Sequence, residues 1–135
     1  MTTLNWSEEF HVNVEEIDTQ HKEMADLVEE LHLAVQNGAD PDTLKHILRS
    51  LIDHTKSHFA SEEALMDKHA YPKARIHKAE HESLMKQLEI VQQALVGGRI
   101  PAFCKNVDIS TDWMMVHVTN SDAELGKFIN RQVPH

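Results

Sequence analysis

The chain of 135 residues has little of several residue types that define common protein classes. It carries one cysteine, Cys104, so neither an intramolecular disulfide nor a cysteine-based zinc site can form, and we expect this thiol to be a small buried apolar group. No apolar run approaches the ~20 residues that a membrane-spanning helix needs. Basic residues number 13 against 22 acidic ones, and the net charge of −9 argues against nucleic acid or an anionic membrane as the partner.

The N-terminal segment also lacks the basic and apolar regions of a secretory signal, so the sequence predicts a cytoplasmic protein. The length fits one ordinary domain with one core, and no repeat or low-complexity tract interrupts it. We therefore expect a single domain over residues 1–135.

Glycine and proline are scarce, with 4 of each, and six of these eight residues gather at three places where helices are expected to end and begin. At the first of these, Asp40 is predicted to cap a helix and Pro41 to be its first residue. The other two breaks lie at residues 69–72 and 97–101. Between the breaks, apolar residues alternate at spacings of four and three, which predicts helices over 17–36, 41–68, 72–96 and 102–118.

Short connections between long amphipathic helices predict an all-α fold, an up-down-up-down four-helix bundle. Ser121 and Glu124 have the spacing of a capping box, which predicts a short C-terminal helix after the fourth one. Ahead of the first helix, an extended N-terminal arm is expected to pack through its apolar residues, which are Trp6, Phe10, Val12 and Val14.

Histidine is the residue type present in excess, with 11 copies. Polar residues interrupt the inward-facing apolar seam of every predicted helix. In an antiparallel bundle, residues equally far from the joining loop lie at the same level. With the first loop centred at residue 39, His21 precedes the centre by 18 residues and His58 follows it by 19, and the remaining levels agree to about 3 Å. One layer is therefore expected to hold five histidines and a glutamate: His21, His58, Glu62, His77, His81 and His117.

Such a layer admits two interpretations, a hydrogen-bonded polar layer in the core or a metal site. Metal coordination explains better why six such residues converge, since unsatisfied buried polar groups are costly. Histidines four apart, such as His77 and His81, lie on one helix face and can share a metal. The residue types admit zinc or manganese as well as iron.

Asp122 is a further candidate ligand. It follows His117 by five residues, and an unbroken helix would turn it away from the seam. The residues between them, Thr119-Asn120-Ser121, are predicted to break the helix. Asp122 then either turns inward or is an ordinary acid in the first turn of the last helix.

Several stretches of the chain together resemble the hemerythrin family, and in particular its bacterial single-domain members, the bacteriohemerythrins. The resemblance covers nearly the whole chain, beginning with Trp6 and Val12-Asn13-Val14. The matching stretches are Ile17-Asp18-Thr19-Gln20-His21-Lys22, His58-Phe59-Ala60-Ser61-Glu62-Glu63 with Met66, Tyr71-Pro72 followed by His77 and His81, and Trp113 with His117 and Asp122.

The resemblance implies a non-haem di-iron centre with a bridging oxo or hydroxo group that binds molecular oxygen reversibly. In the family pattern, His77, His81 and His117 would hold one iron. His21 and His58 would hold the other, while Glu62 and Asp122 would bridge both. The iron held by two histidines has one open coordination position, where oxygen is expected to bind.

The function implied by this resemblance is oxygen storage, delivery or scavenging, without catalysis. Two alternatives stay open, a di-iron peroxidase or nitric-oxide-reducing enzyme with His54 as acid catalyst, and a stand-alone oxygen or redox sensor. An oxygen-consuming or redox protein is a further expected partner.

Three neighbours of the site depart from the family pattern: His54 and Leu125 stand where tyrosine is common, and Leu84 where phenylalanine is common. His54 is either a flanking, partly exposed residue or a polar group close to the site. Glu63 and Asp18 are either exposed charges or hydrogen-bond acceptors for the ligating imidazoles. Apolar residues expected near the layer are Met24, Val28, Leu51, Leu84, Trp113 and Met114, while His11, His32, His46, His69 and His135 are expected outside the seam without a metal role.

Overall fold

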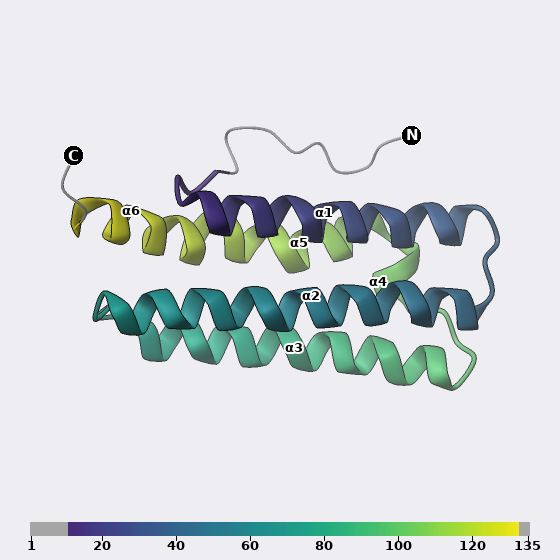
Figure 1. Cartoon of the computed structure of the whole chain (residues 1–135). Coiled ribbons are helices and arrows are strands. Elements are labelled where there is room, and N and C mark those ends of the chain that lie inside the picture. Colours follow the sequence, from purple (N-terminus) through teal and green to yellow (C-terminus); the bar gives the residue numbers. More distant parts are fainter. Residues whose placement is uncertain (1–10, 133–135) are drawn as a thin grey trace.

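The structure, a computed structural model, describes residues 11–132, and the predictions for Trp6 and Phe10 lie outside them. Figure 1 shows four antiparallel rods, which confirms the predicted all-α up-down-up-down bundle. The first three rods are α1 (Glu15–Gln36), α2 (Pro41–Lys68) and α3 (Ala74–Val96). The fourth contains α4 (Ala102–Lys105), α5 (Val107–His117), a π-helical turn η2 (Val118–Asp122) and α6 (Ala123–Gln132). No helix of this described part is long and apolar enough to cross a membrane.

The boundary between α1 and α2 follows the predicted chemistry. Asp40 accepts a hydrogen bond from the Thr43 backbone N–H at 2.9 Å, and Pro41 is the first helical residue. The turn before it needs a left-handed residue, which Gly38 supplies with φ of 78°. Helix α2 therefore begins at the predicted position.

The fourth predicted helix, 102–118, is wrong in one respect, because it is interrupted at Asn106. This residue is extended, with φ of −111° and ψ of 110°, and its side chain accepts a hydrogen bond from the Asp108 N–H at 2.9 Å. Asparagine side chains compete with the helix for backbone N–H groups and favour cap positions. Asn106 therefore separates the short α4 from α5.

The break predicted at Thr119-Asn120-Ser121 is also wrong, because the helix continues through these residues. The backbone stays helical from His117 to Ala123, with a π-turn over Val118–Asp122. Thr119 and Asn120 donate side-chain hydrogen bonds to the carbonyls of Met115 and Val116, both at 2.8 Å. Each bond runs from a side chain to the carbonyl four residues earlier, a pattern that a helix interior tolerates.

Ser121 likewise does not form the predicted capping box with Glu124. Its hydroxyl lies 2.6 and 2.7 Å from the two carboxylate oxygens of Glu80 on α3. The predicted short last helix is present as α6, but it continues directly from the π-turn, without a separate N-cap.

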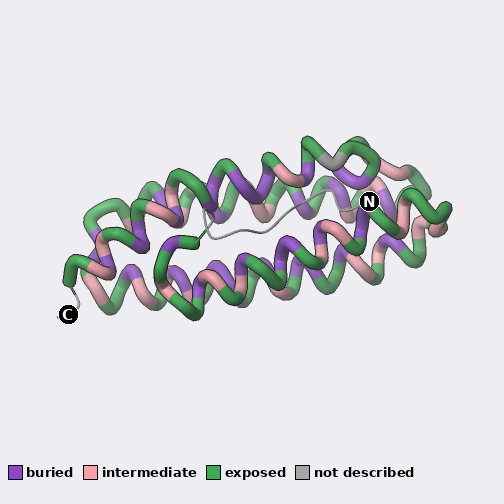
Figure 2. The backbone as a smooth tube through the Cα atoms, turned by 90° about the horizontal axis from the view of Figure 1, so that it is seen from above, coloured by how far each residue is buried: buried purple, intermediate pink, exposed green. Residues whose placement is uncertain are grey.

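The buried residues form a strip along the inner faces of the rods (Figure 2). They divide into a large apolar cluster that includes Leu44, Leu48 and Leu95, and a small one around Ile17 and Leu125. Cys104 belongs to the large cluster, and burial raises the pKa of its thiol to about 11, which confirms the expected inert apolar role. The layer between the two clusters is polar.

The start of the chain's described part is pinned beside α1. The backbone N–H groups of Val12 and Asn13 donate to the Asp18 carboxylate at 2.7 and 3.1 Å. Val12 is buried in the small cluster, as predicted for the N-terminal arm. Asp18 therefore binds backbone groups ahead of α1, and the alternative role as an acceptor for an imidazole is not seen.

Candidate metal centre

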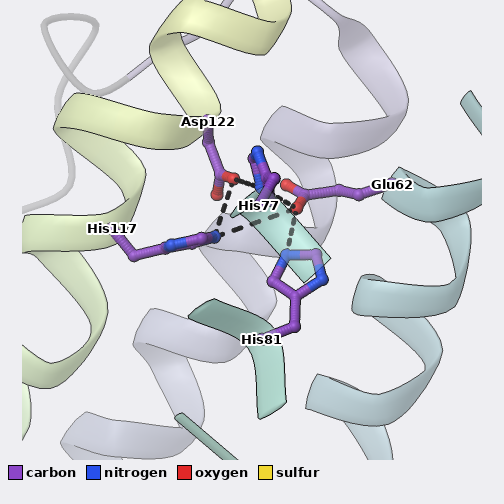
Figure 3. Close-up of side chains that lie close together, drawn as sticks. All are labelled: Glu62, His77, His81, His117 and Asp122. Carbon is purple, nitrogen blue, oxygen red and sulfur yellow. Dashed lines mark hydrogen bonds and ion pairs between the residues drawn. The ribbon is translucent and has the colours of Figure 1, made fainter. Parts of the chain in front are cut away.

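The four rods bring all seven predicted site residues into one buried cluster, five of which appear in Figure 3. Residues four apart on α2 and on α3 share a helix face, so each helix supplies a pair. The π-turn adds one residue to the helical repeat, which brings Asp122 back toward the face of His117 although five residues separate them. The donors are His21 from α1, His58 and Glu62 from α2, His77 and His81 from α3, His117 from α5 and Asp122 from η2.

The cluster divides into two overlapping groups of possible metal donors, within each of which the donor atoms lie within 4.8 Å of one another. The three-histidine group consists of His77, His81 and His117 with both carboxylates. The two-histidine group consists of His21 and His58 with the same two carboxylates.

Each carboxylate directs one oxygen to each group. Glu62 Oε1 lies 2.8 Å from His81 Nε2, while its Oε2 lies 3.1 Å from His58 Nε2. Asp122 Oδ1 lies 3.0 Å from His117 Nε2, while its Oδ2 lies 2.8 Å from His21 Nε2. His77 Nε2 lies 2.9 Å from Asp122 Oδ1. Two carboxylates arranged in this way can bridge two metal ions.

Without a metal, the cluster is stabilised by protons. Burial alone lowers the pKa of His58 and of His77, but hydrogen bonds to Asp122 and Glu62 outweigh it and raise each pKa to about 9. Burial and the charge of Asp122 raise the pKa of Glu62, yet hydrogen bonds from the surrounding histidines hold it well below its usual range. The same balance of burial against hydrogen bonds depresses the pKa of Asp122. In the metal-free cluster, His58 and His77 are therefore imidazolium groups beside two carboxylates at neutral pH.

Several buried donor atoms fit a cation better than they fit one another. His58 Nε2, His117 Nε2, Glu62 Oε2 and Asp122 Oδ1 have no hydrogen bond of good geometry within the described chain. These atoms meet their neighbours only as ion pairs at 2.9–3.1 Å, at angles that are poor for hydrogen bonds. Imidazole nitrogens and carboxylate oxygens are also suitable ligands for iron, zinc or manganese. The residues present therefore fit a pair of metal ions.

The outer nitrogens of two histidines have hydrogen-bond partners, and that of a third lies near a carboxylate without a hydrogen bond. His81 Nδ1 lies 2.9 Å from a Glu63 oxygen, so Glu63 contacts an imidazole as one of its two predicted roles requires. His58 Nδ1 lies 2.6 Å from Gln20 Oε1, and His117 Nδ1 lies 3.6 Å from a Glu80 oxygen. The sequence reasoning missed Gln20 and Glu80, because neither lies on an apolar seam. Phe59 also stacks on His81, with ring centroids 3.8 Å apart.

A small cavity of about 10 Å³ adjoins the two-histidine group. This volume is close to the least that holds one water molecule. Of the apolar residues expected near the layer, Val28 and Leu51 are buried core residues that do not line the cavity, and Phe59 and Val118 were missed. The lining consists of His21, Met24, His58, Phe59, Leu84, Trp113, Met114, His117, Val118 and Asp122.

Of the histidines outside the cluster, His54 matches one of its two predicted roles and His32 differs from its prediction. His54 is partly exposed and pairs with Glu23 at 3.2 Å, so it is a flanking residue and does not line the cavity. His32 was expected outside the seam, yet it is buried against the Ser110 hydroxyl, with which it forms a hydrogen bond. Burial lowers the pKa of His32, which favours the neutral imidazole. His32 is therefore a core residue with Ser110 as its polar partner.

Comparisons with known proteins agree with this geometry. The family model described as "Hemerythrin HHE cation binding domain" matches residues 12–129. A bacteriohemerythrin of Methylococcus capsulatus is 32% identical over 127 residues, covering 93% of this chain and 96% of the relative. Myohemerythrin-1 of Phascolopsis gouldii is 31% identical and covers 87% of each chain.

A solved structure supports the same conclusion. The crystal structure of a wild-type hemerythrin superposes with a TM-score of 0.84 at 31% identity, covering 93% of this chain and 97% of the other. The resemblance drawn from the sequence is confirmed by these matches, and the chain belongs to the hemerythrin family.

Proposed function

We propose that this protein binds molecular oxygen reversibly at a di-iron centre held by the seven cluster residues. His77, His81 and His117 would hold one iron, His21 and His58 would hold the other, and Glu62 and Asp122 would serve both. Two ferrous ions bound there, with an oxo or hydroxo group between them, would supply the electrons for oxygen binding.

One observation carries the proposal: the donors are shared unequally while both carboxylates face both groups. Three imidazoles and two carboxylate oxygens converge on one side, and two imidazoles with two carboxylate oxygens on the other. With one further bridging oxygen, the first side would have six donors and the second five, so one position would stay free on the second. The 10 Å³ cavity lies nearer this second side, since both of its histidines, His21 and His58, line the cavity, whereas His117 alone does so from the three-histidine group.

The chain's residues favour binding over catalysis. Apart from members of the cluster, the cavity lining is apolar or aromatic, so the lining offers no separate acid to protonate a substrate. His54, the acid invoked by the enzymatic alternative, is paired with Glu23 away from the cavity. The apolar side chains of Met24, Leu84 and Met114 exclude bulk water from the free position, which protects ferrous iron from oxidation.

The proposal is tested by loading the protein with ferrous iron in the absence of air. We expect about two irons per chain, and a colour that appears in air and bleaches when oxygen is removed, over repeated cycles. His21→Ala should lose the colour, while His54→Ala, a matched control on the surface, should keep it. Fewer than about two irons in the parent, or a single irreversible oxidation, would refute the assignment.

The biological role of this oxygen binding is storage, delivery or scavenging. A redox protein that returns oxidised iron to the ferrous state is the partner that such a role requires.

A further inference from the structure

The outer partners of the cluster histidines differ in charge between the two groups. In the three-histidine group, His81 and His117 face the carboxylates of Glu63 and Glu80, at 2.9 and 3.6 Å. In the two-histidine group, His58 faces the neutral amide of Gln20 at 2.6 Å. The difference lies in the second layer of contacts, outside the seven donors themselves.

The orientation of the Gln20 amide is set by a second hydrogen bond. Its Nε2 donates to the Ser61 hydroxyl at 3.1 Å, which directs Oε1 toward His58 Nδ1. An amide oxygen only accepts hydrogen bonds, so His58 Nδ1 must carry the proton. The lone pair of a neutral His58 then lies on Nε2, the atom that faces Glu62 and the interior of the cluster.

Gln20 also connects the two helices that supply this group. It precedes His21 on α1, and its partner Ser61 precedes Glu62 on α2. The contact therefore holds His58 in place from a helix other than its own.

We propose that Gln20 is a positioning residue that fixes the tautomer of His58 and, by being neutral, favours the ferrous state at the two-histidine position. The inference rests on the proposed di-iron function. A carboxylate partner raises the basicity of a ligating imidazole and so stabilises the more highly charged metal ion. The neutral amide on one side and the carboxylates on the other make the oxygen-binding position the harder one to oxidise.

The positioning role is tested with cobalt(II), which needs no oxygen chemistry. In Gln20→Leu, the leucine side chain has nearly the same size as glutamine but cannot accept a hydrogen bond from His58 Nδ1. We expect its first cobalt to bind as in the parent and its second to bind roughly 10–100-fold more weakly, the usual effect of losing such a partner. The positioning role would be overturned if the second cobalt bound to Gln20→Leu as tightly as to the parent. Circular dichroism would confirm that both proteins are folded.

The charge argument is tested with a pair of opposite substitutions. Gln20→Glu adds a carboxylate beside His58, and Glu63→Gln removes one beside His81. Both variants should bind two irons, with the midpoint potential lowered in Gln20→Glu and raised in Glu63→Gln. A shift of the same sign in both, or none in either, would overturn the charge argument. Failure of the parent to load two irons would refute the proposed function instead, and the cobalt result would still report on Gln20.

Discussion

Glu62 and Asp122 set the electrostatics of the site at the residue scale. Both are fully buried, and each faces histidines from both groups through separate oxygens. Among the histidines around them, His58 and His77 have raised pKa values and carry protons in the absence of metal, whereas a metal requires neutral imidazoles. Metal and protons therefore compete for the same atoms.

This competition predicts a pH dependence for the metal-free protein. The folded pKa values of His58 and His77, about 9, lie above the ordinary value of 6.5. The stability that they contribute is fully present below pH 6.5 and is lost as the pH rises through 9, by at most about 3 kcal/mol for each histidine. Urea unfolding between pH 6 and 10 should show this decline, and His54→Ala should decline in parallel with the parent. Metal-free stability that rises over this range would contradict the assignment.

The cavity wall gives a second prediction at this scale. Leu84 lines the cavity, whereas Leu88, one turn further along α3, is fully buried and does not line it. We expect Leu84→Ala to admit water and to speed the oxidation of the ferrous protein in air. Leu88→Ala should instead lower the free energy of unfolding by about 2–5 kcal/mol and leave the oxidation rate unchanged. The two variants are compared by absorbance in air and by urea unfolding. Equal oxidation rates in Leu84→Ala and Leu88→Ala would show that Leu84 does not shield the proposed oxygen site.

The π-turn is the important feature at the scale of the element. Before it, the inward positions of the fourth rod are Ser110, Met114 and His117, spaced by four and three. After it, the inward positions are Asp122, Leu125 and Ile129, so the turn lengthens the spacing between inward residues from four to five at this point. A regular helix would present Ser121 in place of Asp122.

Inserting one residue into the turn should therefore remove a metal ligand. An alanine inserted after Asn120 moves Asp122 about 100° further around the helix, away from the cluster. We expect this insertion to keep its helical circular dichroism and to lose bound metal, measured by elemental analysis. Deleting Asn120 instead lets the segment close as a regular α-helix with Asp122 four residues after His117, so the deletion should keep both metals. An insertion variant with two metals per chain would show that the register of Asp122 is not required.

The sequence predicts most of this architecture, and the errors share a physical cause. Six of the cluster residues lie on regular seams, where a spacing of three and four is sufficient to find them. Asp122 depends on a π-turn, whose hydrogen bonds from Thr119 and Asn120 resemble the signals of a helix break. Asn106 interrupts a helix through one side-chain bond, and Gln20 contacts the cluster from outside the seam. Periodicity carries no information about either contact.

At the scale of the whole molecule, the polar layer separates two apolar clusters of unequal size. The small cluster joins the start of α1, the end of α2 and α6 around Ile17, Met66 and Leu125. The large cluster holds the other end of the bundle. The metal-free layer between them is polar and holds no bound ion to join the two ends, so we expect the end with the small cluster to open first.

Metal binding should therefore protect the two ends unequally. A metal present at a thousand times its dissociation constant adds about 4 kcal/mol to the stability of the folded state. Hydrogen exchange should slow most in α6 and near Ile17, and least around Leu44 and Leu48, which lie in the large cluster. Uniform slowing along the chain, compared with the metal-free protein at the same pH, would show that the bundle opens as one unit.

The extra residue in the π-turn also has a consequence for protein design. A straight fourth helix has no inward position five residues after His117, so grafting the seven side chains at their native spacing onto an idealised four-helix bundle would leave Asp122, one of the two proposed bridges, outside the cluster. A scaffold meant to reproduce this centre therefore needs one extra residue in that helix, or the aspartate moved to four residues after the histidine.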